Sequence, residues 1–155
     1  MKVIGDYEGA TKYFDGLTRE HTPFDIIAYS AYPFWSRKTV PEYIQFTNYL
    51  QARYGKPTIL AETGFPWTRE DGDDFGNNMN DAGPEPYPLT PQGQRDFLYE
   101  LINAINTADD GMALGFEYWD PIWIPAKSIK DNVDNYTLFD FHGLPLPALT
   151  QAINN

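Results

Sequence analysis

Three short apolar runs in this chain end in carboxylates and aromatic side chains, and segments with helical patterning separate them. The runs cover residues 24–33, 57–67 and 111–121. Each run is predicted to be a buried strand whose last residues are polar. Alternating helices and strands indicate a parallel sheet with right-handed crossovers, the layout of a β/α barrel, where chemistry gathers at the carboxyl ends of the strands. Because three strands are too few to close a barrel, we expect residues 1–155 to form one partial barrel domain of an enzyme.

The helices between these strands are predicted from apolar spacing and from residues typical of helix ends. Thr39 and Thr90 are expected to cap two of them, and Gly55 is expected to end the first of these two. The predicted helices cover residues 9–17, 39–55, 90–111 and 147–153, the last few residues of each being the stop signal. Two long polar loops, residues 68–91 and 127–135, remain, and loops of this length are usually functional.

Composition excludes several classes of function. The formal net charge is −11, from 22 acidic and 11 basic residues, so we expect no nucleic-acid binding and favour an uncharged substrate or a cation. There is no cysteine to form disulfides or thiolate metal sites. We expect no membrane segment, because no apolar run approaches the length of a membrane span. Aromatic residues make up 16% of the chain, enough either for a core or for a cleft that stacks on sugar rings.

Glu62 is the strongest candidate for a catalytic group. It follows the apolar residues Ile59, Leu60 and Ala61 at the end of the second predicted strand. Strand alternation predicts that Thr58 and Leu60 face the barrel interior together with Glu62. An inward carboxylate is costly unless it has hydrogen-bond donors and a role, which favours a nucleophile. The alternative is a structural carboxylate that caps a loop.

Aromatic and hydroxyl side chains follow the other strands. Tyr32 and Ser30 end the first strand, where the Tyr32 hydroxyl is expected to hydrogen-bond Glu62; the alternative is a tyrosine that closes the core. Trp119 ends the third strand and Trp67 follows Glu62, so both are candidates for a sugar-binding cleft or for ordinary packing. Glu117 shares the strand parity of Trp119 and is a weaker candidate for an acid or a substrate contact.

Oxygen-bearing side chains recur in the two long loops. The first loop carries Asp71, Asp73 and Asn77 around glycines, and the second carries Asp131 and Asp134. Such oxygens can wrap a hard cation, although the closing glutamate of an EF-hand is missing. From these residues alone, a solvated acidic loop is the favoured alternative.

The chain resembles the C-terminal part of an endo-β-1,4-galactanase of glycoside hydrolase family 53. The segments that carry the resemblance are Tyr13-Phe14-Asp15-Gly16-Leu17, Asp25-Ile26-Ile27, Ser30-Ala31-Tyr32-Pro33-Phe34-Trp35, Arg53-Tyr54-Gly55-Lys56, Ala61-Glu62-Thr63, Thr90-Pro91-Gln92-Gly93-Gln94, Tyr118-Trp119-Asp120-Pro121-Ile122-Trp123-Ile124, Asp134-Asn135 and Leu138-Phe139-Asp140. They follow the family's order from about residue 13 to residue 150.

The resemblance implies a (β/α)₈ barrel, of which this chain would hold about strands six to eight. It implies hydrolysis of β-1,4-galactan, a side chain of pectin, with retention of configuration. Glu62 matches the nucleophile, Ser30 and Tyr32 match the end of the sixth strand, and Trp119 matches the end of the eighth.

Bacterial members bind calcium between the last two loops. By resemblance, Asp71, Asp73 and Asn77 supply side-chain ligands, and Phe75 is placed to offer a carbonyl. Asp134 and Asp131 match the far side of the calcium site.

The chain also departs from the family pattern. Ala31 stands where members commonly have tyrosine, and Asp120 stands where they have glutamate. The family's acid/base glutamate belongs to the fourth strand, which is not expected here. A retaining glycosidase needs two carboxyls about 5–5.5 Å apart. Glu8 is not a plausible second carboxyl, because it lies at a helix start, so we expect the isolated chain to be inactive.

Three alternatives stay open: another retaining glycosidase of the same clan, a carbohydrate-binding barrel remnant without catalysis, and a half-barrel that pairs through its exposed sheet edge. The expected partners are a polysaccharide and either an N-terminal half or a second copy. The family's polymeric substrate implies a secreted or periplasmic protein. The first six residues lack the apolar stretch of a signal peptide, so any signal is expected upstream.

Overall fold

The computed structural model describes residues 6–108, 111–126 and 128–153. Residues 1–5, assessed above for a signal peptide, and residues 109–110, part of the predicted end of the third helix, lie outside this part. Within it, no helix is both long enough and apolar enough to cross a membrane.

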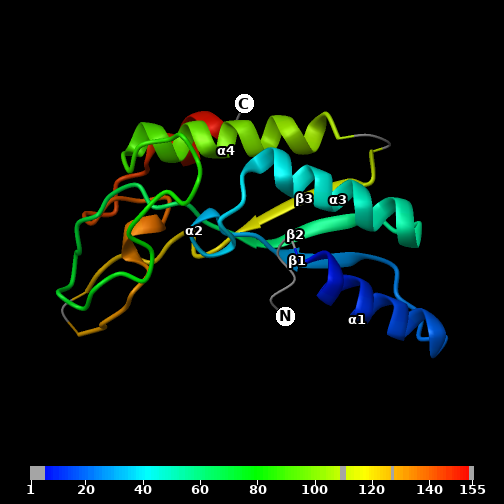
Figure 1. Ribbon diagram of the computed structural model, residues 1–155. Helices are drawn as coiled ribbons and strands as arrows, with labels where there is room; N and C mark the ends of the chain where they lie inside the picture. Colours follow the sequence, from blue (N-terminus) through cyan, green and yellow to red (C-terminus); the bar gives the residue numbers. More distant parts are fainter. Residues whose placement is uncertain (1–5, 109–110, 127, 154–155) are drawn as a thin grey trace.

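Three parallel strands form the sheet, in the order in which they occur in the chain. They are β1 (Ile27–Ser30), β2 (Thr58–Thr63) and β3 (Ala113–Tyr118). All three predicted strands are therefore confirmed. Figure 1 shows that the loops after β2 and β3 gather at one end of the molecule, beyond the carboxyl ends of the strands.

The helices alternate with the strands as predicted, with two additions. They are α1 (Tyr7–Arg19), α2 (Pro33–Ser36), α3 (Val40–Tyr54) and α4 (Pro91–Asn106), followed by the short helical turns η2 (Asp134–Tyr136) and η3 (Ala148–Ala152). The additions are α2 and η2, and a helix of a single turn carries no periodic apolar pattern by which to predict it.

Capping residues explain where the two longest helices begin and end. The Glu42 carboxylate accepts a hydrogen bond from the Thr39 N–H at 2.9 Å, half of a capping box at the start of α3. Gly55 ends this helix with a φ of 62°, a left-handed conformation that glycine adopts without strain. At the start of α4, the Thr90 hydroxyl accepts from the Gly93 N–H at 3.0 Å.

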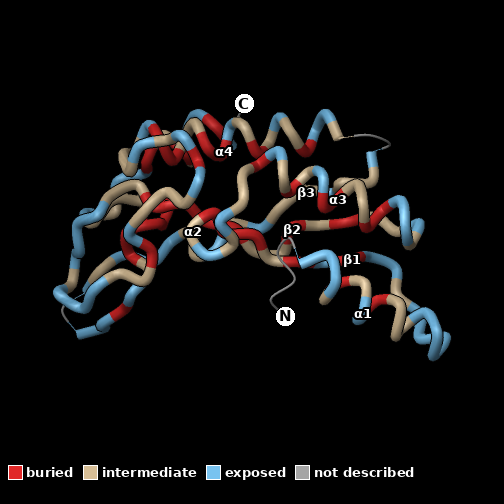
Figure 2. The backbone as a smooth tube through the Cα atoms, viewed as in Figure 1, coloured by how far each residue is buried: buried red, intermediate tan, exposed pale blue. Residues whose placement is uncertain are grey.

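The helices cover one face of the sheet, and the core lies between them and the strands (Figure 2). On this face the Gln51 amide of α3 donates to the Thr58 hydroxyl at 2.9 Å, and Leu60 is buried in the main core. The opposite face is open in the part of the chain that the structure describes, where Ala28, Leu114 and Glu117 are exposed.

Thr58 and Leu60 thus face the helices, so the prediction that they share a face with Glu62 is wrong. The reason is a register shift between β1 and β2: Tyr29 pairs with Leu60, but Ser30 pairs with Glu62. The extra residue in β2 reverses the alternation and turns Glu62 to the open face.

A buried amide joins α4 to the ends of the sheet. Gln94 is fully buried, and its side-chain nitrogen donates to the carbonyls of Phe65 and Thr137, both at 2.9 Å. The Tyr118 hydroxyl lies 3.0 Å from the same nitrogen and donates to the Tyr136 carbonyl at 2.6 Å. Because these carbonyls lie in the chain after β2 and after β3, Gln94 fixes both loops at their roots.

Replacing Gln94 with leucine is expected to lower the free energy of unfolding by about 2 kcal/mol, since it removes the donor to the Thr137 carbonyl and one of two donors to the Phe65 carbonyl. Urea denaturation measures this change. Gln92→Leu, at an exposed position of the same helix, is the matched control and should change stability by less than about 0.5 kcal/mol. Equal effects of the two substitutions would contradict this role of Gln94.

Candidate active site

The Glu62 carboxylate is held where β1 and β2 end. The Tyr32 hydroxyl donates to Glu62 Oε2 at 3.2 Å, the contact that the sequence predicts. The Glu62 carbonyl accepts from the Ala31 N–H at 2.8 Å, which fixes the backbone beneath the carboxylate. Burial raises the pKa of Tyr32 and the nearby charge of Glu62 raises it further, so this hydroxyl keeps its proton and remains a donor.

Ser30 and Trp119 flank this pair. Ser30 stands opposite Glu62 in the β1–β2 register. The Trp119 N–H donates to the Thr63 carbonyl at 2.8 Å, which extends the pairing of β3 with β2, and its side chain is 52% exposed. A half-exposed indole at a strand end has a face free for stacking. The bond between Trp119 and Asp120 is a cis peptide.

Trp67 lies in the wall formed by the two loops. Its ring packs against Phe141 with centroids 4.8 Å apart. Its backbone N–H donates to the Asn135 carbonyl at 2.9 Å. The indole nitrogen is buried and has no hydrogen-bond partner among the described residues. An unpaired buried donor is rare in folded proteins. A contact between Trp67 and substrate stays a prediction.

Tyr136 and Gly64 also belong to the site, although the sequence analysis missed them. A Cβ on Gly64 would lie 3.2 Å from the rings of both Tyr32 and Tyr136 and 2.8 Å from the Trp119 carbonyl. Burial raises the pKa of Tyr136 to about 12, and the charges of Asp120, Asp131 and Glu62 contribute. Gly64, which has no side chain, therefore lets three segments meet beside the carboxylate.

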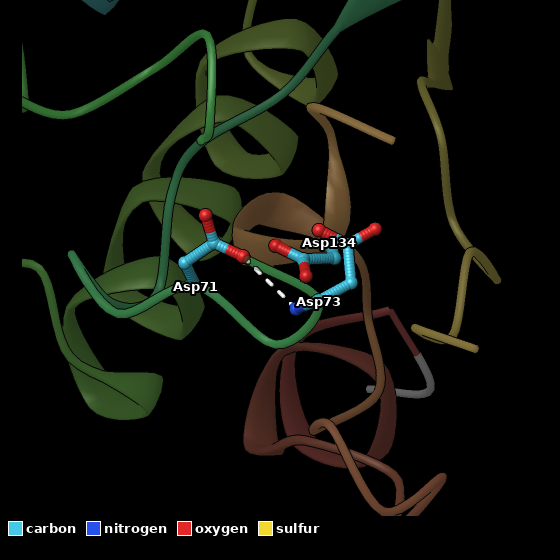
Figure 3. A group of neighbouring side chains, drawn as sticks. All are labelled: Asp71, Asp73 and Asp134. Atoms are coloured by element: carbon cyan, nitrogen blue, oxygen red, sulfur yellow. Dashed lines mark hydrogen bonds between the residues drawn. The ribbon is translucent and has the colours of Figure 1, made fainter. Parts of the chain in front are cut away.

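The two long loops bring three carboxylates together, as Figure 3 shows. Asp71, Asp73 and Asp134 each offer an oxygen, and these oxygens lie within 4.8 Å of one another. Two hydrogen bonds join the loops here: the Gly72 N–H donates to Asp134 Oδ2 at 2.9 Å, and the Asp131 N–H donates to Asp73 Oδ2 at 2.8 Å. We call Asp71, Asp73 and Asp134 the acidic cluster. The two hydrogen bonds beside it join residues that are 58 or more positions apart in the sequence.

Several oxygens at the acidic cluster lack partners. Asp134 Oδ1, Asp131 Oδ2 and Asn77 Oδ1 are buried without a hydrogen bond among the described residues. Burial raises the pKa of Asp134, whereas backbone N–H groups, that of Asp73 foremost, lower the pKa of Asp71. The Phe75 N–H donates to Asp73 Oδ1 at 2.9 Å, and its ring is exposed. A set of ligands that are all oxygens, several of them buried without a hydrogen-bond partner among the described residues, suits a hard cation such as calcium.

Glu85 anchors the loop after β2, and no sequence motif marked it. It is 7% exposed, and its Oε1 accepts from the Val40 N–H at 2.7 Å, at the start of α3. Burial raises the pKa of Glu85 to about 7, with further repulsion from Glu100 and Glu42.

Comparison with known proteins identifies the family. The sequence profile of Glycosyl hydrolase family 53 matches residues 4–152. The chain belongs to this family. It is 32% identical, over 86% of its length, to an endo-β-1,4-galactanase of Bacillus subtilis, and 34% identical, over 94%, to an uncharacterized protein in the bgaB 5′ region of Niallia circulans.

The fold agrees with this assignment. The structure matches an Ignisphaera aggregans GH53 catalytic domain with a TM-score of 0.84 and 32% identity over 96% of the chain. The three-stranded sheet is therefore the C-terminal part of a (β/α)₈ barrel. The family 53 chain spans 43% of that domain, and 39% and 42% of the two sequence relatives.

Because the pKa of Glu85 is raised in the folded state, the free energy of unfolding is expected to depend on pH. The unfolded state releases this proton near pH 4.5 and the folded state near pH 7, so the folded state holds more protons between these values. The free energy of unfolding should therefore fall by roughly 2–3 kcal/mol as pH rises from about 4.5 to about 8. Denaturation across this range measures the slope.

Glu85→Gln should remove most of this slope, because the amide does not titrate. The exposed Glu20→Gln is the control and should keep it. A slope that survives in Glu85→Gln would assign the pH dependence to other groups.

Proposed function

We propose that this chain carries the nucleophile part of a retaining glycosidase site that cleaves β-1,4-galactosidic bonds in galactan. The observation that carries the proposal is the Glu62 carboxylate at the end of β2, turned to the open face and bound by Tyr32. Membership of family 53 and the relative named as an endo-β-1,4-galactanase support the substrate. A galactan polymer as substrate also supports action outside the cytoplasm.

The proposed mechanism is a double displacement. Tyr32 binds Oε2, which leaves Oε1 of Glu62 to attack the anomeric carbon while a carboxylic acid protonates the departing glycosidic oxygen. Water then attacks the glycosyl-enzyme with the second carboxyl group as base, and Glu62 is released. We assign the second carboxyl to the part of the barrel outside these 155 residues, so the chain alone should not turn over substrate.

Trp119 is proposed to stack on a sugar ring. Ser30 lies beside Glu62 in register, and the Trp67 indole N–H is unpaired within the part of the chain that the structure describes; both are proposed to hydrogen-bond sugar hydroxyls. The buried Ala31, before Tyr32, and Asp120, after Trp119, remain the two positions where the subsites would differ from the family pattern.

We expect reducing sugar to be released from β-1,4-galactan when the chain is mixed with the separately expressed N-terminal half of a related galactanase. Glu62→Gln should reduce this release by at least about 10³-fold, since it removes the nucleophile. Xylan as an alternative substrate tests whether another glycosidase activity of the clan is present.

Two outcomes would contradict the proposal. Turnover by the chain alone would place a second carboxyl within it, and turnover unaffected by Glu62→Gln would remove Glu62 from the mechanism. Galactan binding that survives Glu62→Gln, without turnover in any preparation, would favour a carbohydrate-binding remnant.

The acidic cluster is proposed to bind calcium as a structural ion. Asp71, Asp73 and Asp134 would hold it, with Asn77 and Asp131 nearby and the Phe75 carbonyl as a further candidate. A bound cation would offset the repulsion between these carboxylates and join the loops after β2 and β3. Its proposed contribution is to fix the loops that frame the site.

Calcium is expected to raise the free energy of unfolding of the chain by about 2.7 kcal/mol at roughly 100 times its Kd, and magnesium by less. Asp134→Asn should abolish this gain. Asp74→Asn, at an exposed left-handed position of the loop after β2, should keep it. Denaturation with calcium or with EDTA measures the difference. An equal gain in the free energy of unfolding for the unaltered chain, Asp134→Asn and Asp74→Asn would contradict a calcium site at Asp134.

A further inference from the structure

A small apolar cluster, separate from the main core, includes the tyrosine that hydrogen-bonds the proposed nucleophile. Tyr32, Met79 and Tyr136 form it, with exposed fractions of 4%, 0% and 1%. These residues come from the chain after β1, from the loop after β2 and from η2. The cluster therefore joins three separate segments at one point.

The ring of Tyr32 has little room to move within this cluster. The Trp35 ring lies roughly perpendicular to it at a centroid distance of 4.8 Å, and a Cβ on Gly64 would lie 3.2 Å from a carbon of the Tyr32 ring. Met79 and Tyr136 belong to the same buried cluster. The Tyr32 hydroxyl thus reaches Glu62 from a ring held on several sides.

The hydrogen bond from Tyr32 to Glu62 tolerates little displacement of the ring. At 3.2 Å it is longer than the usual 2.7–2.8 Å of O–H···O bonds, so a displacement of a few tenths of an ångström would break it. Packing that keeps the ring in place therefore decides whether Glu62 keeps this donor.

Met79 is itself held by the opposite loop. The Asn135 amide donates to the Met79 carbonyl at 2.6 Å, and the Asn78 N–H donates to the Asn132 carbonyl at 2.9 Å. These bonds place the Met79 backbone, and its fully buried side chain belongs to the cluster that includes Tyr32.

We propose that Met79 is a positioning residue for Glu62, acting by packing Tyr32 into hydrogen-bond contact with the carboxylate. The loop after β2 then supplies the side chain that orients the carboxylate at the end of the same strand. The catalytic consequence rests on the proposed function, whereas the effect on the Tyr32–Glu62 contact does not.

The first test uses NMR of this chain with carbon-13-labelled tyrosine and needs no activity. Glu62→Gln should shift the Tyr32 ring signals, which Tyr32→Phe identifies. In a Met79→Ala background this shift should fall by about half or more, because truncation leaves space into which the ring relaxes. Met79→Leu, which keeps the volume, should retain the shift.

Leu98→Ala is the matched control, because it truncates a fully buried side chain of the main core without touching this cluster. It should lower stability and leave the response of Tyr32 to Glu62→Gln unchanged. An undiminished response in Met79→Ala, or an equal loss in Leu98→Ala, would overturn the proposal.

The second test applies to the preparation that hydrolyses galactan. Met79→Ala should lower kcat about 10-fold with little change in KM, because the carboxylate is no longer held in the reactive orientation. Met79→Leu should restore kcat. A rise in KM alone would overturn the positioning role, and absence of galactan hydrolysis in every preparation would count against the proposed function while the NMR result still decides the contact.

Discussion

The extra residue in β2 is the feature on which the candidate site depends. Thr58 and Leu60 face the helices, and regular alternation would place Glu62 on the same face, inside an apolar layer. An ionised carboxylate there would lose its hydration without gaining charged partners, at a large cost in free energy. The shift that pairs Ser30 with Glu62 turns the carboxylate to the open face, within reach of Tyr32.

Polar contacts between the chain after β2 and the chain after β3 hold the surroundings of Glu62 in place. Gln94 and Tyr118 bind the loop roots, the acidic cluster joins the loops farther out, and Asn135 binds Thr68 and Met79. Since most of these groups are buried, each lost partner leaves an unsatisfied group. The loops therefore behave as one wall of the site rather than as two independent connections.

The open face of the sheet follows from the barrel architecture. In a closed (β/α)₈ barrel, side chains on the inner face pack in layers against those of the other strands. Here Leu114 is 52% exposed and Ala28 is exposed on that face, while the helix-covered face is buried. The surface that carries Glu62 is thus continuous with apolar surface that only further strands would cover.

The amino-acid sequence by itself determined the order of the strands and longer helices, the family, and the contact between Tyr32 and Glu62. Apolar periodicity, the caps at Thr39 and Thr90, and residues such as Glu62 at strand ends are local signals that survive without contacts. Tertiary structure decided which way Glu62 points, because a bulge arises from pairing with β1. It also decided the roles of Gly64, Met79, Glu85 and Tyr136, which depend on neighbours distant in the sequence and carry no local pattern.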